Sequence, residues 1–277
     1  MKLLSFRRPD GTPSWGIVKG EGVIDLGARA PSLKHALWAT ASLAAEASAP
    51  ATFALSDVTY LPPIPDPEKI LCVGLNYLSH ILEGGREPPE KPIIFTRYPN
   101  SQVGHGESLV RPNASHTFDY EGELAVIIGR QCRHVAKADW QTVVAGYSCY
   151  NDGSIREWQR HSSQFIPGKN FYKTGSFGPW IVTPDEMGDP TKATLLTRLN
   201  GVEQQRATVD DLCFDIPTLI EYCSTFTQLE AGDVIVTGTT GGVGAYQKPP
   251  LWMKPGDSLE VEISNIGILR NPVIGEG

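Results

Sequence analysis

The chain after residue 69 alternates between short runs of apolar, often β-branched residues and turns that contain glycine or asparagine. Such runs, bounded by turn residues, are typical of β-strands. They predict strands within residues 71–76, 92–97, 123–129, 178–183, 195–201, 233–238 and 258–263. Helical patterns are fewer and predict helices within residues 77–83, 136–146, 154–161 and 216–225. Strand and helix do not alternate regularly as in a parallel doubly wound sheet, so the pattern predicts a β-rich α+β fold.

Residues 1–60 have a pattern of their own. Strand-like runs within residues 2–26 are separated by glycine-containing turns, and residues 32–48 form an alanine- and leucine-rich segment that begins at a helix N-cap residue, Ser32. Residues 61–68 then carry four prolines, which exclude a helix or a central strand. We expect a small N-terminal α+β domain at 1–60, a proline-rich linker at 61–68 and a larger catalytic domain at 69–277.

Composition narrows the functional classes. The 277 residues carry 24 lysines and arginines against 31 aspartates and glutamates, a net charge of −7, so a broad nucleic-acid-binding surface is not expected. No run approaches the roughly 18 consecutive apolar residues of a membrane span, and the apolar N-terminal stretch is too short for a signal peptide. The five cysteines show no C-x-x-C spacing, which argues against a zinc site or a disulfide framework. We expect a cytoplasmic protein that binds neither nucleic acid nor membranes.

Two glutamates lie at the start of the apolar strand predicted at 123–129, directly after a polar segment. Glu121 and Glu123 are two residues apart, so on a strand they point to the same side, roughly 7 Å apart. The following LAVII is apolar on both faces and predicts burial on both sides. Two buried carboxylates repel each other unless a cation lies between them, and Mg²⁺ and Mn²⁺ prefer such oxygen ligands. The pattern alone leaves open that the strand end is exposed and both glutamates are solvated.

Asp152 follows another apolar run and precedes the helix predicted at 154–161. By itself, an aspartate at this place is most often a turn or N-cap residue. Arg156 and Gln159 follow at spacings that would place them on one helix face with Asp152. Lys169 follows a glycine in a loop, where a lysine is ordinarily a surface charge.

His80 and Glu83 are neighbours on one turn of the helix predicted at 77–83. A histidine held by a carboxylate is a general base that can activate water, and the two glycines after Glu83 permit the movement of a lid. An exposed ion pair followed by a glycine cap fits the same residues. The glycine-rich loop at 237–244 lacks the phosphate-binding and dinucleotide motifs, so it is either an ordinary turn or a loop that approaches an anion.

Taken in order, the segments resemble the fumarylacetoacetate hydrolase superfamily from about residue 69 to residue 273. The resemblance rests on GLNYLSHILE at 74–83, DYEGELAVIIGR at 119–130, GYSCYNDGSIREWQ at 146–159, GKNF at 168–171, GPWIVTPDE at 178–186, LNGVEQQ at 199–205, GDVIVTGTTGGVG at 232–244 and GDSLEVEISNIGILRNPV at 256–273. Two positions depart from the family pattern: Thr240 replaces the proline of T-G-T-P, and Tyr172 replaces the aspartate of G-K-x-x-D, which removes support expected near Lys169. The N-terminal unit is similar to the small leading domain of many bacterial members.

The resemblance implies a mixed β-roll that holds Mg²⁺ or Mn²⁺ and forms a homodimer. The metal-ligand positions of the family are matched by Glu121, Glu123 and Asp152. The lid pair that activates water is matched by His80 and Glu83. The positions that hold substrate, stabilise the oxyanion or frame the pocket are matched by Lys169, Gln159, Arg156 and Thr239.

The expected activity is hydrolysis of the C3–C4 bond of 2,4-dioxo acids such as acylpyruvates, with release of pyruvate or a related 2-oxo acid. An oxaloacetate-type decarboxylase or a 2-oxo acid tautomerase, isomerase or hydratase would use the same metal site. The His80–Glu83 pair favours hydrolysis, because tautomerisation needs no activated water. A catalytically inactive ligand-binding member would show a broken ligand set or lid, and these positions are intact.

Overall fold

The centre of the molecule is a twelve-stranded mixed sheet, seen in a computed structural model that describes residues 1–277 apart from the side chains of residues 38–42 and 44. Its strands run in the order β4 (Phe53–Ala54), β3 (Gly22–Asp25), β2 (Pro13–Lys19), β1 (Lys2–Arg7), β14 (Gly175–Val182), β12 (Val144–Asn151), β11 (Gly122–Ile128), β17 (Val234–Thr239), β6 (Ile70–Gly74) and β7 (Ile93–Arg97). Two short strands extend it: β5 (Thr59–Tyr60) pairs with β1, and β8 (Gln102–Val103) pairs with β14.

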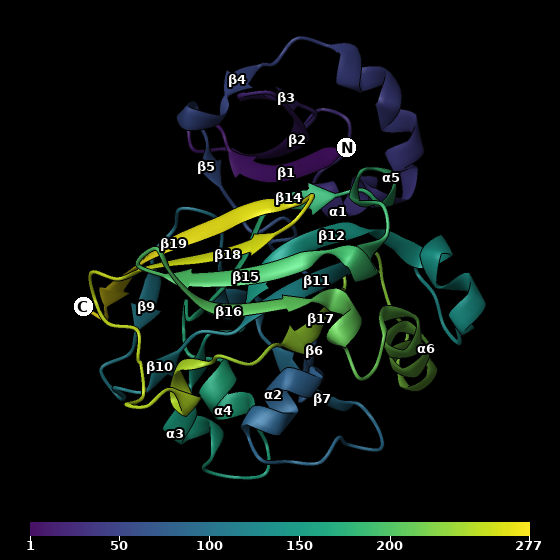
Figure 1. The fold of residues 1–277 in the computed structure, drawn as a ribbon. Coiled ribbons are helices and arrows are strands. Elements are labelled where there is room, and N and C mark those ends of the chain that lie inside the picture. The colour runs from purple at the N-terminus through teal and green to yellow at the C-terminus, as the bar shows by residue number, and fades with distance from the viewer.

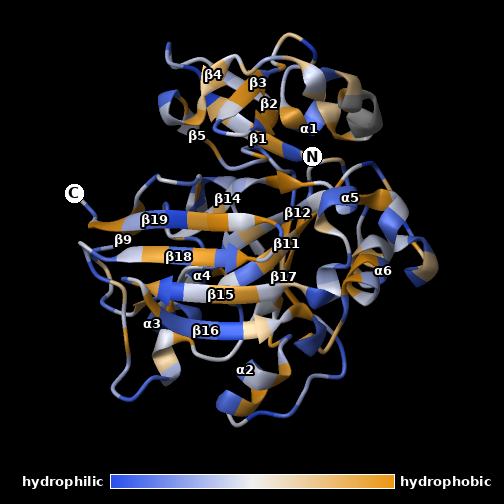
Figure 2. Cartoon of the chain, turned by 45° about the horizontal axis from the view of Figure 1, so that its top comes forward, coloured by the Kyte–Doolittle hydropathy of each residue, from blue (hydrophilic) through white to orange (hydrophobic). Residues whose placement is uncertain are grey.

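A second sheet packs against the first. It contains β16 (Val202–Thr208), β15 (Thr194–Leu199), β18 (Ser258–Ile263), β19 (Gly267–Gly275) and β9 (Leu109–Arg111), while β10 (Phe118–Asp119) and β13 (Ser154–Ile155) form a separate pair. In Figure 1 the second sheet forms a layer over β11 and β12. Burial alternates along β18, because one face packs inward and the other faces out. Hydrophobic and hydrophilic residues alternate along the same strand (Figure 2). The predicted β-rich α+β fold is confirmed, as two open sheets in contact.

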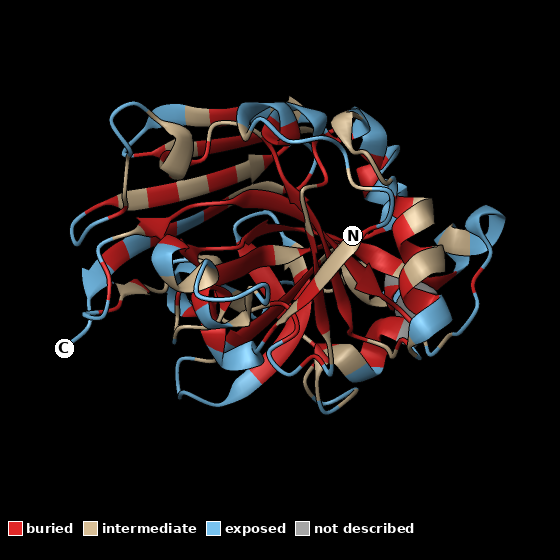
Figure 3. Ribbon diagram, turned by 90° about the horizontal axis from the view of Figure 1, so that it is seen from below, coloured by how far each residue is buried: buried red, intermediate tan, exposed pale blue. Residues whose placement is uncertain are grey.

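Strand β11 lies between two hydrophobic cores, and all of its residues are buried. Figure 3 shows that buried residues gather along the strands in the interior, whereas the loops around them are exposed. Leu124 and Val126 pack in a core shared with the second sheet, whereas Ala125 and Ile127 pack on the other face with residues of the N-terminal region. This alternation follows from the period of two along a strand. The prediction that LAVII is buried on both sides is confirmed, and the burial carries the polar residues before it into the interior.

Most of the helices are short, and the longest α-helix, α6 (Ile216–Phe226), packs its buried residues into the core shared by the two sheets. The α-helices are α1 (Leu33–Ala36), α2 (Leu78–Glu83), α3 (Arg156–Gln159), α4 (Ile166–Lys169), α5 (Pro184–Met187) and α6 (Ile216–Phe226). The 3-10 helices are η1 (Leu37–Ser48), η2 (Leu55–Asp57), η3 (Pro99–Ser101), η4 (Lys137–Val143), η5 (Pro190–Lys192), η6 (Val209–Asp211) and η7 (Gly244–Tyr246). No helix among the described residues is long and apolar enough to cross a membrane.

The helix predictions agree best with the structure where the predicted segment contains no strand residues. The predictions at 77–83 and 216–225 match α2 and α6, and the segment 32–48 is helical but mostly of the 3-10 type. The prediction at 154–161 is wrong at both ends, because Ser154 and Ile155 pair with Asp119 and Phe118. The prediction at 136–146 is wrong after residue 143, where β12 begins. In both segments, pairing with a distant strand outweighs local helix propensity.

The N-terminal strands continue the central sheet. Residues Lys2 and Leu3 of β1 pair with Val182 and Ile181 of β14, and Figure 1 shows β1–β5 above the remaining strands. Residues 61–68 contain neither helix nor strand, as their prolines predict. The division into domains at 1–60 and 69–277 stays a prediction.

Candidate metal centre and lid

Three carboxylates lie close together where β11 begins and β12 ends. Gly122 pairs with Asn151, and the Asp152 amide donates to the Glu121 carbonyl at 2.8 Å, so the strand register brings Asp152 beside the two glutamates. One oxygen from each of Glu121, Glu123 and Asp152 lies within 4.8 Å of the others, and all three residues are buried. We call these three residues the floor.

The charges of the floor are unequally compensated. Glu121 forms ion pairs with Arg156 Nη1 and Lys169 Nζ, both at 2.6 Å, and Lys169 Nζ also lies 2.7 Å from Asp152 Oδ2. Although burial alone would raise it, the pKa of Glu121 is lowered to about 2 by these two cations. Glu123 accepts only the Gly238 amide, at 2.6 Å, and has no lysine or arginine partner among the described residues.

Burial, together with the carboxylates of Asp152 and Glu121, raises the pKa of Glu123 well above its ordinary value. A buried carboxylate without a counter-ion is costly, and a cation between the three side chains would remove that cost. The donor atoms are all carboxylate oxygens, which suit a hard divalent ion such as Mg²⁺ or Mn²⁺. The residues present therefore fit a divalent cation.

Lys169 ends α4 and is 2% exposed. Burial lowers its pKa, but the carboxylates of Asp152 and Glu121 outweigh burial and raise it, so the ammonium is retained. Gly168 permits the approach of this helix, because a Cβ there would lie 2.3 Å from the backbone nitrogen of Gln159. The floor itself holds Lys169, whereas Tyr172, at the position of the missing aspartate, is 61% exposed.

Two buried charged residues escaped the sequence analysis. The Arg97 side chain forms an ion pair with Asp152 and donates to the Gly153 carbonyl at 2.9 Å. Asp119 accepts Arg156 Nε at 2.7 Å and the backbone amides of Gly244 and Ala245 at 2.8 and 2.9 Å. A single charge beside an apolar strand was the available signal in each case. Because the partners of Arg97 and Asp119 are distant in sequence, this signal could not identify the ion pairs that the two residues form.

The predicted substrate-contacting residues line one pocket with the two glutamates of the floor. Arg156 Nη1 donates to Gln159 Oε1 at 3.0 Å, and the buried Nη2 atom has no hydrogen-bond partner. Thr239 accepts Gln205 Nε2 at 2.8 Å and donates to the Gly122 carbonyl at 3.0 Å. The expectation that Asp152 shares a helix face with Arg156 is wrong, because α3 begins only at Arg156.

The helix α2 and the two glycines after it, residues 78–85, contribute His80 to the pocket wall, and we call this segment the lid. His80 Nδ1 lies 3.5 Å from Glu83 Oε2, and His80 is 8% exposed. Both Glu83 oxygens accept the Gly242 amide, at 3.0 and 3.1 Å, and the Tyr246 ring lies 5.9 Å from the His80 ring. His80 therefore belongs to the pocket wall, whereas Glu83 is exposed and does not itself line the pocket. The loop at 237–244 is more than a turn, since its amides bind both Glu83 and Glu123.

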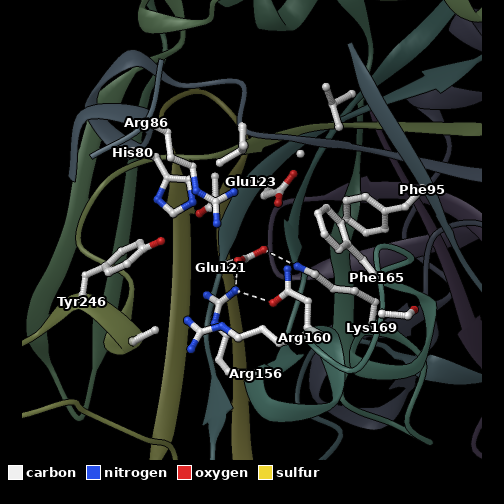
Figure 4. Close-up of a pocket in the computed structure, with 17 residues that line it drawn as sticks. His80, Arg86, Phe95, Glu121, Glu123, Arg156, Arg160, Phe165, Lys169 and Tyr246 are labelled. Carbon is white, nitrogen blue, oxygen red and sulfur yellow. Dashed lines mark hydrogen bonds and ion pairs between the residues drawn. The ribbon is translucent and has the colours of Figure 1, made fainter. Parts of the chain in front are cut away.

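The pocket has a volume of about 290 Å³. Its wall includes the floor glutamates, Lys169 and Arg156 on one side and His80 on the other (Figure 4). A small organic acid of a few carbons is the size of ligand that such a pocket encloses. The arrangement can bind an anion beside buried carboxylates and place an imidazole opposite it.

Comparison with known proteins gives the family. The family described as fumarylacetoacetate (FAA) hydrolase C-terminal matches residues 69–274. The chain is 37% identical to the mitochondrial oxaloacetate tautomerase FAHD2A of Homo sapiens, over 99% of this chain and 92% of that protein.

Solved structures of similar proteins support the same family. A maleylpyruvate hydrolase from Sphingobium sp. SYK-6, in complex with manganese (II) ion and pyruvate, is 28% identical with a TM-score of 0.84, and all of both chains is covered. A 5-carboxymethyl-2-hydroxymuconate delta-isomerase from Mycobacterium smegmatis is 32% identical with a TM-score of 0.82, again over all of both chains. These relatives are enzymes. The chain described above belongs to the fumarylacetoacetate hydrolase family.

Proposed function

We propose that this chain is a divalent-metal-dependent enzyme of 2-oxo acids, and that its reaction is the keto–enol tautomerisation of an oxaloacetate-type substrate. The observation that carries the proposal is the buried floor of Glu121, Glu123 and Asp152, whose two glutamates line one small pocket together with His80. The reaction is favoured by the 37% identity to an oxaloacetate tautomerase over nearly the whole chain. The metal is Mg²⁺ or Mn²⁺, and its ligands are the three floor carboxylates.

The binding step follows from the unpaired donors of the pocket. Arg156 Nη2, buried without a partner, binds the substrate carboxylate together with Gln159. The retained positive charge of Lys169 stabilises negative charge that develops on the 2-oxo oxygen. The floor would hold a divalent ion, which supplies Lewis-acid stabilisation of the same charge.

The proton-transfer step belongs to the lid. His80 takes a proton from C3 of the keto form and returns a proton to the 2-oxo oxygen, so no atom is gained or lost. Glu83, held by the Gly242 amide, orients the imidazole and stabilises its protonated form. Thr239 frames the pocket without entering the chemistry.

Hydrolysis of 2,4-dioxo acids is the second candidate. Here His80 deprotonates a water that attacks the C4 carbonyl, the C3–C4 bond breaks, and the leaving enolate of pyruvate is protonated. The maleylpyruvate hydrolase structure and the preserved His80–Glu83 pair favour this reaction. The sequence by itself favours hydrolysis, through the His80–Glu83 pair. The tautomerase relatives reverse the order, because their identity to this chain is higher.

The test uses the purified chain with Mg²⁺, with Mn²⁺ and with EDTA. Enol oxaloacetate is followed by loss of ultraviolet absorbance, with carbon dioxide release measured in parallel, and acetylpyruvate is followed by pyruvate release. Metal-dependent acceleration of enol loss without carbon dioxide supports the tautomerase. Pyruvate release from acetylpyruvate alone assigns the hydrolase instead, and carbon dioxide release assigns a decarboxylase. Absence of every metal-dependent activity contradicts the proposal.

The predicted homodimer and cytoplasmic location remain proposals. Size-exclusion chromatography with light scattering measures the first. The location needs an experiment in the source cell, and the human relative is named a mitochondrial protein.

A further inference from the structure

Asp119 is a buried carboxylate that takes no part in the proton transfer. It ends β10 and is 0% exposed. Its Oδ1 atom accepts the backbone amides of Tyr120 and Gly244 at 2.9 and 2.8 Å. Its Oδ2 atom accepts Arg156 Nε at 2.7 Å and the Ala245 amide at 2.9 Å. Each carboxylate oxygen has two lone pairs, so none is left for a metal ion or a proton, and the role of this side chain is to hold its partners.

The first partner is the guanidinium of Arg156. Asp119 accepts from its Nε atom, whereas Glu121 and Gln159 contact its Nη1 atom at 2.6 and 3.0 Å. A guanidinium is planar, so contacts at two of its three nitrogens fix its orientation, and the third, Nη2, is buried without a partner. Glu121 is shared with Lys169 and is a proposed metal ligand. Asp119 is therefore the carboxylate that holds the guanidinium without serving the floor.

The other partners include two amides of η7, which forms another part of the pocket wall. Ala245 and Tyr246 line the pocket, and Figure 4 shows Tyr246 on the same side of it as His80. The two rings lie 5.9 Å apart. Gly244 permits the close approach of this turn, because a Cβ there would lie 2.6 Å from Asp119 Oδ1. The carboxylate that orients the guanidinium therefore also fixes the turn beside the lid histidine.

We propose that Asp119 is a positioning residue for the reaction, which holds the Arg156 guanidinium in the orientation that binds substrate and ties it to the turn beside the lid. The assignment rests on the proposed function, because Asp119 acts through Arg156, the residue proposed to bind the substrate carboxylate.

The benefit of this arrangement is preorganisation. Arg156 and the turn at 244–246 are far apart in the chain, but both are bonded to the same carboxylate, so their relative position is set before a ligand arrives. A guanidinium that is already oriented loses less freedom when it binds an anion, which makes binding tighter. Loss of Asp119 should therefore weaken the binding of a carboxylate ligand without changing the floor.

The experiment measures oxalate binding to the Mn²⁺-loaded protein by isothermal titration calorimetry, because oxalate carries a carboxylate beside a second oxygen donor, as a 2-oxo acid does. Asp119→Asn keeps the shape of the side chain but replaces one accepting oxygen with an NH₂ group, which cannot accept from Arg156 Nε. Oxalate affinity should fall about 10-fold, the effect of one hydrogen bond to a charged group. Mn²⁺ affinity should stay at the wild-type value, because the floor carboxylates are unchanged.

A double-mutant cycle separates positioning from general damage. If Asp119 acts through Arg156, Asp119→Asn should have no further effect on oxalate affinity in a chain that already carries Arg156→Lys. Asp119→Glu is the second variant and carries the test if Asp119→Asn does not fold. It keeps the negative charge but moves the carboxylate by one methylene, so it should also weaken oxalate binding, because a small misplacement is enough to spoil the orientation of the guanidinium.

The matched control is Asp257→Asn, at another buried aspartate that does not line the pocket. Asp257 accepts the Lys254 amide at 2.8 Å, Lys254 Nζ at 2.9 Å and Asn200 Nδ2 at 3.0 Å. Its variant should bind oxalate as the wild type does. Wild-type oxalate affinity in Asp119→Asn or Asp119→Glu, or additive effects in the cycle, overturns the positioning role and leaves the 2-oxo acid site standing. Absence of oxalate binding by the wild type overturns the proposed function itself.

Discussion

The floor and the lid face each other across one pocket but are built differently. The floor stands at the ends of two central strands, and Glu121 and Asp152 are held there by Lys169, Arg97 and Arg156. The lid is a helix of six residues with exposed apolar side chains, Leu78 at 42% and Leu82 at 70%. Metal ligands need rigid placement, whereas a general base on a lid can move with the segment that carries it. Metal binding by the floor and proton transfer by the lid should therefore be separable by mutation.

The largest effect is expected from Glu123→Gln. This variant keeps the size of the side chain but removes the carboxylate that lacks a cationic partner. Mn²⁺ affinity should fall by more than about 100-fold, because residues that only support a metal ligand typically cost about 10- to 100-fold when they are replaced. Turnover should be lost with the metal. Calorimetric titration with Mn²⁺ measures it. Glu157→Gln, on an exposed residue of α3, is the matched control and should bind Mn²⁺ normally. Normal Mn²⁺ affinity in the Glu123 variant would exclude this residue as a ligand.

His80→Asn tests the lid alone. Loss of the general base should lower kcat by about 10²- to 10⁴-fold, while Mn²⁺ affinity stays at the wild-type value because the floor is untouched. Steady-state kinetics and Mn²⁺ titration on the same preparation give both numbers. A parallel fall in metal affinity would show that lid and floor are coupled, and unchanged kcat would remove His80 from the mechanism.

Arg97→Met tests the support under the floor. The variant leaves the buried Asp152 carboxylate without one of its two cations, which should cost about 3–5 kcal/mol of unfolding free energy. Urea unfolding followed by tryptophan fluorescence measures the change. Arg206→Met removes an exposed ion pair to Glu203 and should change stability by less than about 1 kcal/mol. Equal stability of the two variants would contradict the structural role of Arg97.

Ser79→Ala gives the smallest expected effect. Ser79 Oγ donates to Asp211 Oδ2 at 2.8 Å and lies 3.1 Å from Thr240 Oγ1, so the hydroxyl ties the lid to the body of the molecule. Its loss should cost about 1 kcal/mol of lid closure. Hydrogen exchange should then accelerate about fivefold at residues 78–85 and remain unchanged along β11. Equal acceleration along β11 would mean that the lid is not an independent unit.

Much of the site was predictable because its signals are local. The period of two placed Glu121 and Glu123 on one side of a strand, and the apolar run after them predicted their burial. The spacing of three placed His80 beside Glu83 on one helical turn. Resemblance to a family added roles for Arg156, Gln159 and Thr239, and for Asp152 and Lys169, where the local pattern favoured an ordinary turn or surface role. The structure gathers them in and around one pocket, and their individual roles remain proposals.

The sequence by itself determined the short strands, the two-sided burial of β11 and the common side of Glu121 and Glu123, because each depends on neighbours within a few residues. Tertiary structure alone decided that Asp152 lies beside Glu121, that Arg97 neutralises it, and that β1 joins β14. These outcomes depend on strand register and on charge compensation in a low-dielectric interior. Both forces act between residues far apart in the chain, where local periodicity carries no information.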